Sequence, residues 1–258
     1  MEAFIEKWEK TASPKSNKTD KCSKQDKPDK SDNSDKPKRK KVVKTALKSC
    51  FTEGDTIEVG IDEAGRGPMF GRVYAAAAIL PKDDSFNHAL MKDSKRFHSK
   101  KRIMEAYEYI KENAIAYCVQ YSDEDTIDRI NIRQATLQTM HNAVKGLGVR
   151  PDMLLVDGND FKPMMRMNAS GDSLEQISHV CIEGGDNKYT PIAAASILAK
   201  VERDLYIEKL CEENPELEEC YGILSNKGYG TKKHLDGIRE RGITPFHRKT
   251  YGICKDYC

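Results

Sequence analysis

The stretch Ile57-Glu-Val-Gly-Ile-Asp-Glu-Ala-Gly-Arg-Gly-Pro68 is the part of the chain around which the rest is organised. Its first half alternates apolar residues, which predicts a β-strand over Ile57–Ile61. Two carboxylates, Asp62 and Glu63, follow where this strand is expected to stop, and the glycines and proline after them predict a turn. Carboxylates can hold divalent metal ions, and a glycine-flanked arginine can hold a phosphodiester or a ribose. The stretch therefore predicts a site that could bind metal ions together with a phosphodiester or a ribose.

The charge of the chain is unevenly distributed. Its 258 residues carry a formal net charge of +2, but residues 11–50 hold 13 Lys/Arg against 5 Asp/Glu, so residues 51–258 are mildly acidic. Residues 11–41 contain almost no apolar side chains, and such a segment cannot bury enough surface to offset its ordering entropy. We therefore expect a disordered basic tail over residues 1–50 and one folded domain over residues 51–258.

The tail contains two further patterns. Phe4, Ile5 and Trp8 have helical spacing, which fits a short docking helix or a frayed terminus. The cluster Lys36-Pro-Lys-Arg-Lys-Lys41 fits a nuclear address, a nucleic-acid clamp or a merely solubilising segment. The sequence leaves these alternatives open.

Composition also limits where the protein works. No run approaches the roughly 20 apolar residues of a membrane span, and the first ten residues are too charged for a secretory signal. The eight cysteines form no C-x-x-C pair, which favours reduced thiols. We expect a soluble intracellular protein, in the cytoplasm, or in the nucleus if the Lys36–Lys41 cluster is a nuclear address.

The folded part alternates strands and helices, which predicts the α/β class with a mixed sheet of about five strands. The first three strands, with little helix between the first two, suggest an antiparallel meander. The expected strands are Ile57–Ile61, Gly71–Leu80, Ala114–Tyr121, Asp152–Asp157 and His179–Glu183. The expected helices are 99–112 with Ser99 as N-cap, Ile130–Gly146, a long helix capped by Thr190 and running to about Glu212, and Thr231–Arg241.

Acidic residues stand where elements end or pack. In an α/β sheet, ligands lie beyond the strand ends, which is where Asp62 and Asp157 are expected. Asp204 falls on the same helix face as Ile197, which predicts that it points toward the sheet rather than to water. Strand alternation would send Glu63 to the face opposite Asp62, so the backbone would have to turn at Glu63 for both to reach one site.

Several acids in one place repel one another unless cations separate them. Two Mg²⁺ ions roughly 3.5–4 Å apart would do so and would clamp a scissile phosphate. The alternative is less specific: a strand-end Asp is often a turn residue or a helix cap. A mid-helix Asp often pairs with a neighbouring cation, and Lys200 or Arg203 is available to Asp204.

Aromatic and basic residues near the C-terminus fit a nucleic acid. Tyr229 lies between two glycines in Asn226-Lys-Gly-Tyr-Gly-Thr231, which would expose its ring for stacking on a base or sugar. The alternative is a tyrosine that packs in the core. His247-Arg-Lys-Thr-Tyr251 adds basic groups suited to phosphates, and Asp93-Ser-Lys95 offers a further cation.

Taken together, these segments resemble the ribonuclease HII family, the type 2 ribonucleases H. The resemblance covers about residues 55–251 and rests on several long motifs in the family's order. They are Asp62-Glu-Ala-Gly-Arg-Gly-Pro68, Asp93-Ser-Lys95, Val156-Asp-Gly158, the segment Gly184–Asp204, Asn226-Lys-Gly-Tyr-Gly-Thr231 and Thr244-Pro-Phe-His-Arg248.

The resemblance implies a ribonuclease H-like fold with a C-terminal helical portion. It implies endonucleolytic hydrolysis of the RNA strand of RNA–DNA hybrids, and incision 5′ of ribonucleotides embedded in duplex DNA, leaving 3′-hydroxyl and 5′-phosphate ends. Two divalent ions, Mg²⁺ or Mn²⁺, would be the cofactors. The implied roles are ribonucleotide excision repair and RNA primer removal in DNA replication.

The resemblance also assigns residues. Asp62, Glu63, Asp157 and Asp204 match the family's catalytic metal-binding acids. The expected substrate-binding residues are Gly65, Arg66 and Gly67 at the ribose 2′-hydroxyl, Tyr229 at the RNA–DNA junction, and Lys95, Lys200 and Arg248 near phosphates.

The chain departs from the family pattern at Arg72, where Gly-Pro is common after the signature, and in its basic tail. It ends soon after Arg248, which suggests a self-sufficient monomer. One alternative is type 3 ribonuclease H specificity, which the Arg66-Gly-Pro form and Tyr229 disfavour. Another is a catalytically silent hybrid-binding module, which the four intact acids disfavour.

Overall fold

The computed structural model describes residues 46–258 except 92–93, 95–96, 98 and 169. The predictions for the basic tail, including Phe4, Ile5, Trp8 and the Lys36–Lys41 cluster, lie outside the described residues, and so does Lys95. Lys48 already belongs to the folded unit, because its N–H donates to Lys188 O at 2.9 Å. Among the helices of the described part, none is long and apolar enough to cross a membrane.

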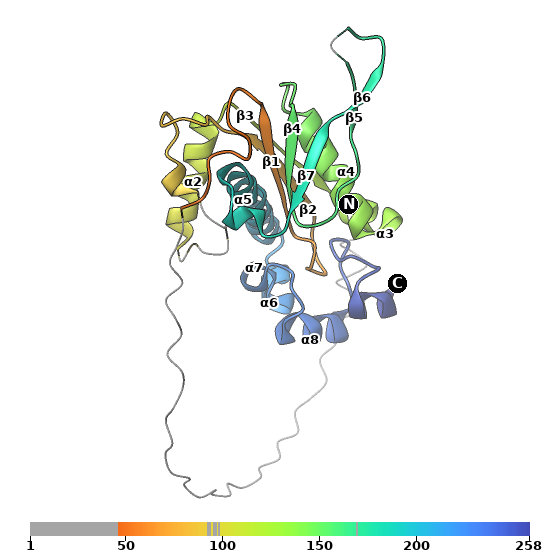
Figure 1. Ribbon diagram of the computed structural model, residues 1–258. Coiled ribbons are helices and arrows are strands. Elements are labelled where there is room, and N and C mark those ends of the chain that lie inside the picture. Colours follow the sequence, from red (N-terminus) through yellow and green to blue (C-terminus); the bar gives the residue numbers. More distant parts are fainter. Residues whose placement is uncertain (1–45, 92–93, 95–96, 98, 169) are drawn as a thin grey trace, which may run out of the picture. The chain divides into compact units, whose positions relative to one another are not determined.

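A five-stranded mixed sheet forms the centre of the folded unit (Figure 1). Its order is β3 (Ala116–Ser122), β2 (Val73–Ile79), β1 (Glu58–Ala64), β4 (Met153–Asp157) and β7 (Ser178–Ile182). The first three strands form the predicted antiparallel meander, and β4 and β7 run parallel to β1. The predicted α/β class and mixed sheet are confirmed, and the carboxyl ends of β1, β4 and β7 meet at one edge.

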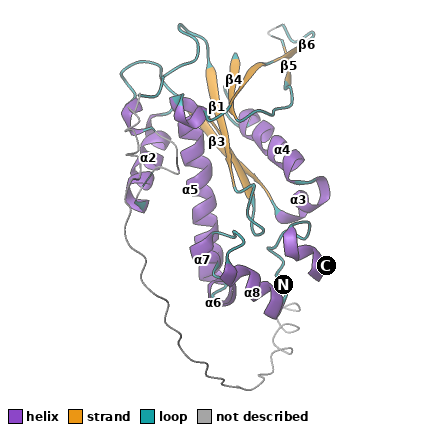
Figure 2. Ribbon diagram, turned by 60° about the horizontal axis from the view of Figure 1, so that its bottom comes forward, coloured by secondary structure: helices purple, strands orange, loops and turns teal. Residues whose placement is uncertain are grey.

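Helices cover both faces of this sheet (Figure 2). On one face, α5 (Thr190–Glu213) crosses the strands and α2 (Lys100–Asn113) packs beside it. The opposite face is covered by α4 (Ile132–Lys145). Strand β1 has a glycine at position 60 because α5 lies against it there: a Cβ on Gly60 would stand 2.0 Å from the carbonyl carbon of Pro191.

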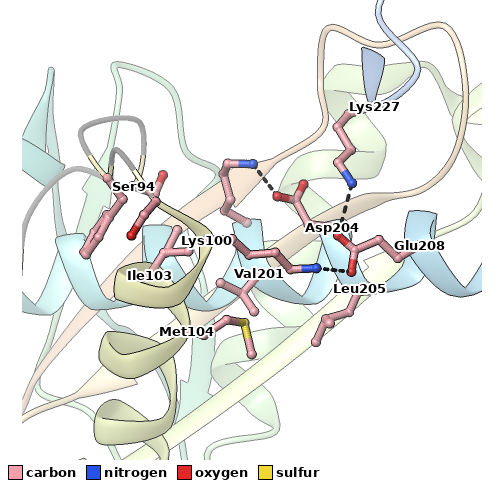
Figure 3. A pocket seen from close by; sticks show the side chains of 12 residues that line it. Ser94, Lys100, Ile103, Met104, Val201, Asp204, Leu205, Glu208 and Lys227 are labelled. Carbon is pink, nitrogen blue, oxygen red and sulfur yellow. Dashed lines mark hydrogen bonds and ion pairs between the residues drawn. The ribbon is translucent and has the colours of Figure 1, made fainter. Parts of the chain in front are cut away.

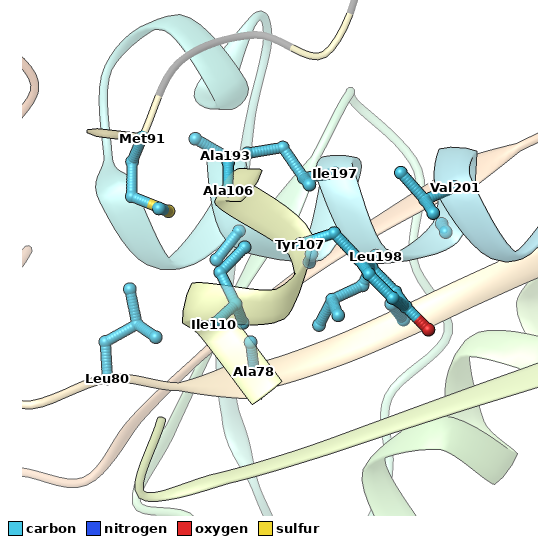
Figure 4. Close-up of a cluster of buried hydrophobic side chains, with 14 of the residues drawn as sticks. Ala78, Leu80, Met91, Ala106, Tyr107, Ile110, Ala193, Ile197, Leu198 and Val201 are labelled. Atoms are coloured by element: carbon cyan, nitrogen blue, oxygen red, sulfur yellow. The ribbon is translucent and has the colours of Figure 1, made fainter. Parts of the chain in front are cut away.

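Small side chains of β2 let α5 approach closely. Even-numbered residues of β2, such as Ala76 and Ala78, face α5 and α2, and odd-numbered residues face α4. Figure 4 shows the first of these clusters, in which Ala78, Ile110 and Leu198 pack together. All seven residues of β2 are buried, as expected for an interior strand covered on both faces.

The remaining elements surround this centre. A C-terminal helical portion, predicted from the family resemblance, gathers at one end of α5 (Figure 1). Its helices are α6 (Glu216–Tyr221), α7 (Ile223–Asn226) and α8 (Lys232–Arg241), followed by η4 (Gly252–Tyr257). Elsewhere lie η1 (His88–Leu90), α3 (Glu124–Ile130), the hairpin β5 (Met165–Met167) and β6 (Leu174–Gln176), and η3 (Gly185–Asn187).

The first predicted strand has a different end. The strand expected over Ile57–Ile61 continues to Ala64, because Asp62, Glu63 and Ala64 pair with residues of β2. The prediction that the strand stops at the acid pair is therefore wrong. The turn comes at Gly65, whose φ of +93° favours glycine.

Two predicted helices also differ in detail. The helix expected over Ile130–Gly146 is α4 and begins at Ile132, because Asn131 has a φ of +65° that a right-handed helix cannot include, and Ile130 ends the preceding helix α3. The Asn131 side chain instead caps α4 by accepting from the N–H of Gln134. Thr190 is the first residue of α5 and not its N-cap, and its hydroxyl lies 2.8 Å from His88 Nδ1.

Candidate active site

Two of the predicted acids lie side by side. Ile61 of β1 is the register partner of Val156 of β4, so the next residues, Asp62 and Asp157, stand on neighbouring strands. Both follow the alternation that places Gly60 and Leu155 against α5, so both carboxyls are on the α5 face. The expectation that Asp62 and Asp157 meet at a strand-end site is thus supported by the geometry.

Asp62 is buried beneath α5. Its carboxyl is hydrogen-bonded to the hydroxyl of Ser196, and its Oδ1 accepts from the N–H of Glu63 at 2.6 Å. The Ser196 hydroxyl lies 2.9 Å from that of Ser94, so Ser94 is the residue of the Asp93-Ser-Lys95 motif that the structure places beside the site. Burial, together with the charges of Glu63 and Asp157, raises the pKa of the Asp62 carboxyl well above its usual value.

Glu63 points to the other face of β1, as strand alternation dictates. Its neighbours on that side of the strand are Val59 and Ile61, which pack against α4. Its carboxylate is paired with Arg66, with 3.2 Å between Oε1 and the guanidinium. The backbone does not turn at Glu63, so this acid reaches the edge of the site from the opposite face of the strand, close enough to affect the pKa of Asp62.

A fourth acid at this edge was missed in the sequence. Asp186 is buried in η3, just after the end of β7, the strand that pairs with β4. The preceding residue, Gly185, donates its N–H to Asp157 Oδ1 at 2.7 Å, which ties this turn to Asp157. The sequence did contain a signal, because Asp186 follows the expected strand His179–Glu183 within Gly184-Gly-Asp-Asn187, much as Asp157 ends the strand before it.

The structure does not bring Asp204 to these acids. It lies eight residues beyond Ser196 on α5, which is about 12 Å along a helix. Its carboxylate accepts from Lys200 Nζ at 2.6 Å, and its side chain is 27% exposed. The prediction that Asp204 points toward the sheet is wrong, since the buried position belongs to Arg203, whose guanidinium donates to Phe70 O and Arg72 O.

Asp204 instead lines a pocket between α2 and α5, whose lining also includes Ser94 and Lys200 (Figure 3). In that pocket Glu208 is paired with Lys100 and with Lys227, at 2.6 and 3.3 Å. Lys200, predicted as a phosphate neighbour, lies on α5 between Ser196 and Asp204. It is one helical turn from Ser196 and hydrogen-bonded to Asp204. The structure therefore agrees with the alternative prediction, in which Asp204 pairs with a lysine of its own helix.

The acids at the strand ends suit divalent cations. The pKa of the Asp62 carboxyl is raised by burial and by two neighbouring carboxylates, and among the described residues no cation offsets its ionised form. Oxygen ligands of this kind are those that Mg²⁺ and Mn²⁺ prefer. In the described part of the chain, no three acidic, histidine or cysteine side chains already stand at the spacing of a ligand cluster. The donor set fits such ions by its chemistry.

A glycine-rich loop follows β1 and is held from inside by Arg248. Arg248 is fully buried, and its guanidinium donates to four carbonyl oxygens of this loop. These oxygens belong to Gly65, Arg66, Pro68 and Gly71, at 2.6 to 3.1 Å. The expectation that Arg248 contacts phosphate is not supported by this position, because its donors are directed at the backbone of the loop.

The carbonyl bonds also orient the N–H groups of the loop. In a planar trans peptide, the N–H of one residue points opposite to the carbonyl of the residue before it. Because Gly65 O and Arg66 O point inward to Arg248, the N–H groups of Arg66 and Gly67 point outward. Outward N–H groups beside glycine can receive an oxygen of a ligand at close range.

Tyr229 stands beside these N–H groups. Its ring lies against Gly67, where an added Cβ would be 3.3 Å from Tyr229 Cε1, and the residue is 52% exposed. The two segments are also joined through the backbone, since the N–H of Met69 donates to Gly228 O at 3.0 Å. Tyr229, expected at the RNA–DNA junction, is thus exposed and lies beside Gly67, one of the residues expected at the ribose 2′-hydroxyl.

Replacing Arg248 with Met should destabilise the protein by at least about 3 kcal/mol, because buried carbonyls would lose their donors. Arg248→Lys should recover less than half of that loss, since an ammonium cannot reproduce the planar donor fork. Urea unfolding measures both. Arg239→Met, which removes an exposed pair with Asp236, should cost no more than about 1 kcal/mol. An Arg248→Lys variant as stable as wild type would contradict this account of the loop.

Comparison with known proteins gives a consistent result. A family model described as Ribonuclease HII matches residues 59–254. Ribonuclease HII from Bacteroides thetaiotaomicron is 46% identical over 206 residues, which are 80% of this chain and 94% of the relative. Ribonuclease HII from Cytophaga hutchinsonii is 44% identical over 207 residues, with 80% and 94% covered.

Solved structures share the fold at lower identity. The ribonuclease H2 from Pyrococcus horikoshii OT3 superposes with a TM-score of 0.61 at 23% identity, covering 78% of this chain and 96% of that one. The RNase HII of Archaeoglobus fulgidus, solved in complex with PCNA, gives 0.58 at 24% identity, with 76% and 95% covered. Bst-RNase HIII in complex with Mn²⁺ gives 0.53 at 20% identity, with 79% and 70% covered.

Proposed function

This chain belongs to the ribonuclease HII family and is a type 2 ribonuclease H, and from that premise we propose that it incises duplex DNA on the 5′ side of embedded ribonucleotides. It would also cut the RNA strand of RNA–DNA hybrids. Both reactions would leave 3′-hydroxyl and 5′-phosphate ends. The observation that carries the proposal is the contact of the glycine-rich loop with the exposed ring of Tyr229, next to the strand-end acids.

The acids supply the hydrolytic half of the proposal. Asp62, Glu63 and Asp157, together with Asp186, would hold two divalent ions, Mg²⁺ or Mn²⁺. When bound, such ions would offset the negative charge that develops on the scissile phosphate. Ser196 would keep the Asp62 carboxyl in one orientation through its hydrogen bond, and Lys200, one turn further along α5, would attract the incoming phosphate backbone.

The loop and Tyr229 supply the choice of where to cut. The 2′-hydroxyl separates a ribonucleotide from a deoxyribonucleotide, and it can both donate and accept a hydrogen bond. The outward N–H groups of Arg66 and Gly67 would donate hydrogen bonds to the 2′-oxygen, while the Tyr229 ring would stack on the sugar or base next to it. Cleavage at one embedded ribonucleotide needs both contacts, because the rest of the duplex is DNA.

These activities would serve ribonucleotide excision repair and the removal of RNA primers during DNA replication. In both tasks the substrate contains a junction between RNA and DNA. A site that reads one 2′-hydroxyl and the adjoining sugar can act at such a junction without a long RNA segment.

Three end-labelled duplexes test the proposal: all-DNA, DNA with one ribonucleotide, and a continuous RNA–DNA hybrid. With Mg²⁺ or Mn²⁺ we expect one nick on the 5′ side of the single ribonucleotide, cleavage of the hybrid at many positions, and no cut in the all-DNA duplex. EDTA should stop both reactions. Cleavage of the hybrid without incision at the single ribonucleotide would reject the proposed specificity and leave the family activity in place.

A further inference from the structure

Two histidines form a buried pair behind Tyr229. His234 lies in the first turn of α8, and His247 lies in the segment that follows this helix. Both are buried, and their Nε2 atoms lie 3.0 Å apart. The ring of Phe70 meets that of His247 edge-on with 5.0 Å between centroids, so the pair is enclosed by aromatic side chains.

The hydrogen bonds of the pair run in one direction only. The backbone N–H of Thr244 donates to His247 Nδ1 at 3.0 Å, so that nitrogen is an acceptor and the neutral ring carries its proton on Nε2. His247 Nε2 therefore donates to His234 Nε2. His234 then carries its proton on Nδ1, which donates to the carbonyl oxygen of Tyr229 at 3.0 Å.

Both rings must be neutral for this arrangement. A proton on His247 Nδ1 would face the Thr244 N–H, and a proton on His234 Nε2 would face that of His247. Burial and the neighbouring His234 lower the pKa of His247 to about 3, and burial lowers the pKa of His234. The pair is therefore a fixed set of hydrogen bonds at neutral pH.

The pair links the two halves of the site that would read the ribose. His234 holds the carbonyl of Tyr229, whose ring lies on Gly67. His247 precedes Arg248, which grips the carbonyls of the loop that contains Gly67. Through His247 and Arg248, the position of Tyr229 is coupled to the position of the loop.

We propose that His234 and His247 are positioning residues that set the place of Tyr229 over Gly67 and thereby the preference for a single ribonucleotide, an inference that rests on the proposed function. Neither histidine touches the strand-end acids in this arrangement, so their loss should act on selectivity more than on hydrolysis itself. The quantity that reports this is the ratio of kcat/KM for the single-ribonucleotide duplex to that for the continuous hybrid.

His234→Phe tests the proposal. Phe keeps the ring in the aromatic cluster but removes both nitrogens, so we expect the ratio to fall about tenfold while hybrid cleavage falls less than threefold. His234→Asn, whose side-chain N–H can donate to Tyr229 O, should recover part of the ratio. Tyr221→Phe is the matched control: it removes one hydrogen bond to Gly242 O from the same cluster and should leave the ratio unchanged. Equal losses on both substrates for His234→Phe would overturn the proposal.

A double-mutant cycle with Tyr229→Ala checks the route of the effect. If His234 acts through Tyr229, His234→Phe should change the ratio less than twofold in the Tyr229→Ala background. If His234→Phe lowers the ratio by the same factor with Tyr229 and with Tyr229→Ala, the two residues act independently and the proposal fails.

A measurement without catalysis separates this proposal from the proposed function. Nitrogen-15 NMR of the histidine rings should show the proton on Nδ1 of His234 and on Nε2 of His247 at neutral pH. A charged ring or the opposite tautomer in the wild type would overturn the inference, whatever the activity. Failure to nick a single ribonucleotide, in contrast, would reject the proposed specificity on its own.

Discussion

Asp62→Asn should abolish cleavage of RNA–DNA hybrids, with a loss of roughly 10³-fold or more, while binding of the hybrid changes less than about threefold. The reason is the place of this carboxyl: it is buried, it stands beside Asp157 on the neighbouring strand, and it is held by Ser196. Single-turnover cleavage with Mg²⁺ or Mn²⁺, and binding measured in EDTA, give the two quantities. The exposed acid change Asp236→Asn should leave both unaltered.

The same substitution should raise the stability of the metal-free protein, and by more at higher pH. The pKa of Asp62 is higher in the folded state than in the unfolded chain. At pH values between these two pKa values, the folded state therefore binds a proton that the unfolded chain has released. The stabilising contribution of the protonated Asp62 carboxyl is therefore fully present below the usual carboxyl pKa. It is lost as pH rises through the raised pKa of the folded state. Asparagine has no such loss.

Thermal unfolding in EDTA from pH 4 upward measures this difference. The gain in Tm of Asp62→Asn over wild type should be small at the lowest pH and should increase until the Asp62 carboxyl is ionised. A gain that is constant across pH, or a lower Tm at neutral pH, would show that the carboxyl does not carry an unfavourable charge in the absence of metal.

Asp186→Asn and Asp204→Asn should have very different effects on kcat. We expect the Asp186 change to lower kcat by at least about 10²-fold, since this acid lies buried at the edge where β1, β4 and β7 end. The Asp204 change should lower it less than about fivefold, because that carboxylate is paired with Lys200 and lies about 12 Å along α5 from Ser196, the residue that contacts Asp62. Steady-state rates on the continuous hybrid, at saturating metal, decide between them.

Stability provides the control for this pair. The Lys200–Asp204 contact is partly exposed, so losing it should cost no more than about 1 kcal/mol. The Asp204 variant should therefore be folded, and circular dichroism checks the folding of both variants. An inactive Asp204→Asn beside an active Asp186→Asn would restore the assignment made from the helix pattern and refute the one made from the structure.

Much of the fold was predictable because it depends on short-range patterns. Apolar alternation and all-apolar runs marked the five strands of the main sheet within a few residues, and Ser99 caps α2 as expected. The errors came where a single residue decides an end. Asn131 breaks a helix pattern through its positive φ, and Asp62 and Glu63 stay in β1 because β2 supplies pairing partners.

The residue types that make the chemistry were readable in the chain: carboxylates near expected strand ends and a tyrosine between two glycines. Whether they meet was not readable. Helix periodicity placed Asp204 on an inward face, but it cannot say how far along α5 the strand ends lie, and the answer makes Asp186 the nearer acid. Burial likewise turned Arg248 from an expected phosphate contact into the support of the glycine-rich loop.

Local pattern thus accounts for the strands, the helices and the motif that spans the end of β1. That motif, Asp62–Pro68, supplies one acid pair and a loop whose carbonyls point inward. Its partners are 95 to 183 residues away in the chain: Asp157 of β4, Tyr229 and Arg248. Long-range contacts of this kind depend on how the layers pack, because the direction of a side chain is set by its element but its neighbours are set by the other elements.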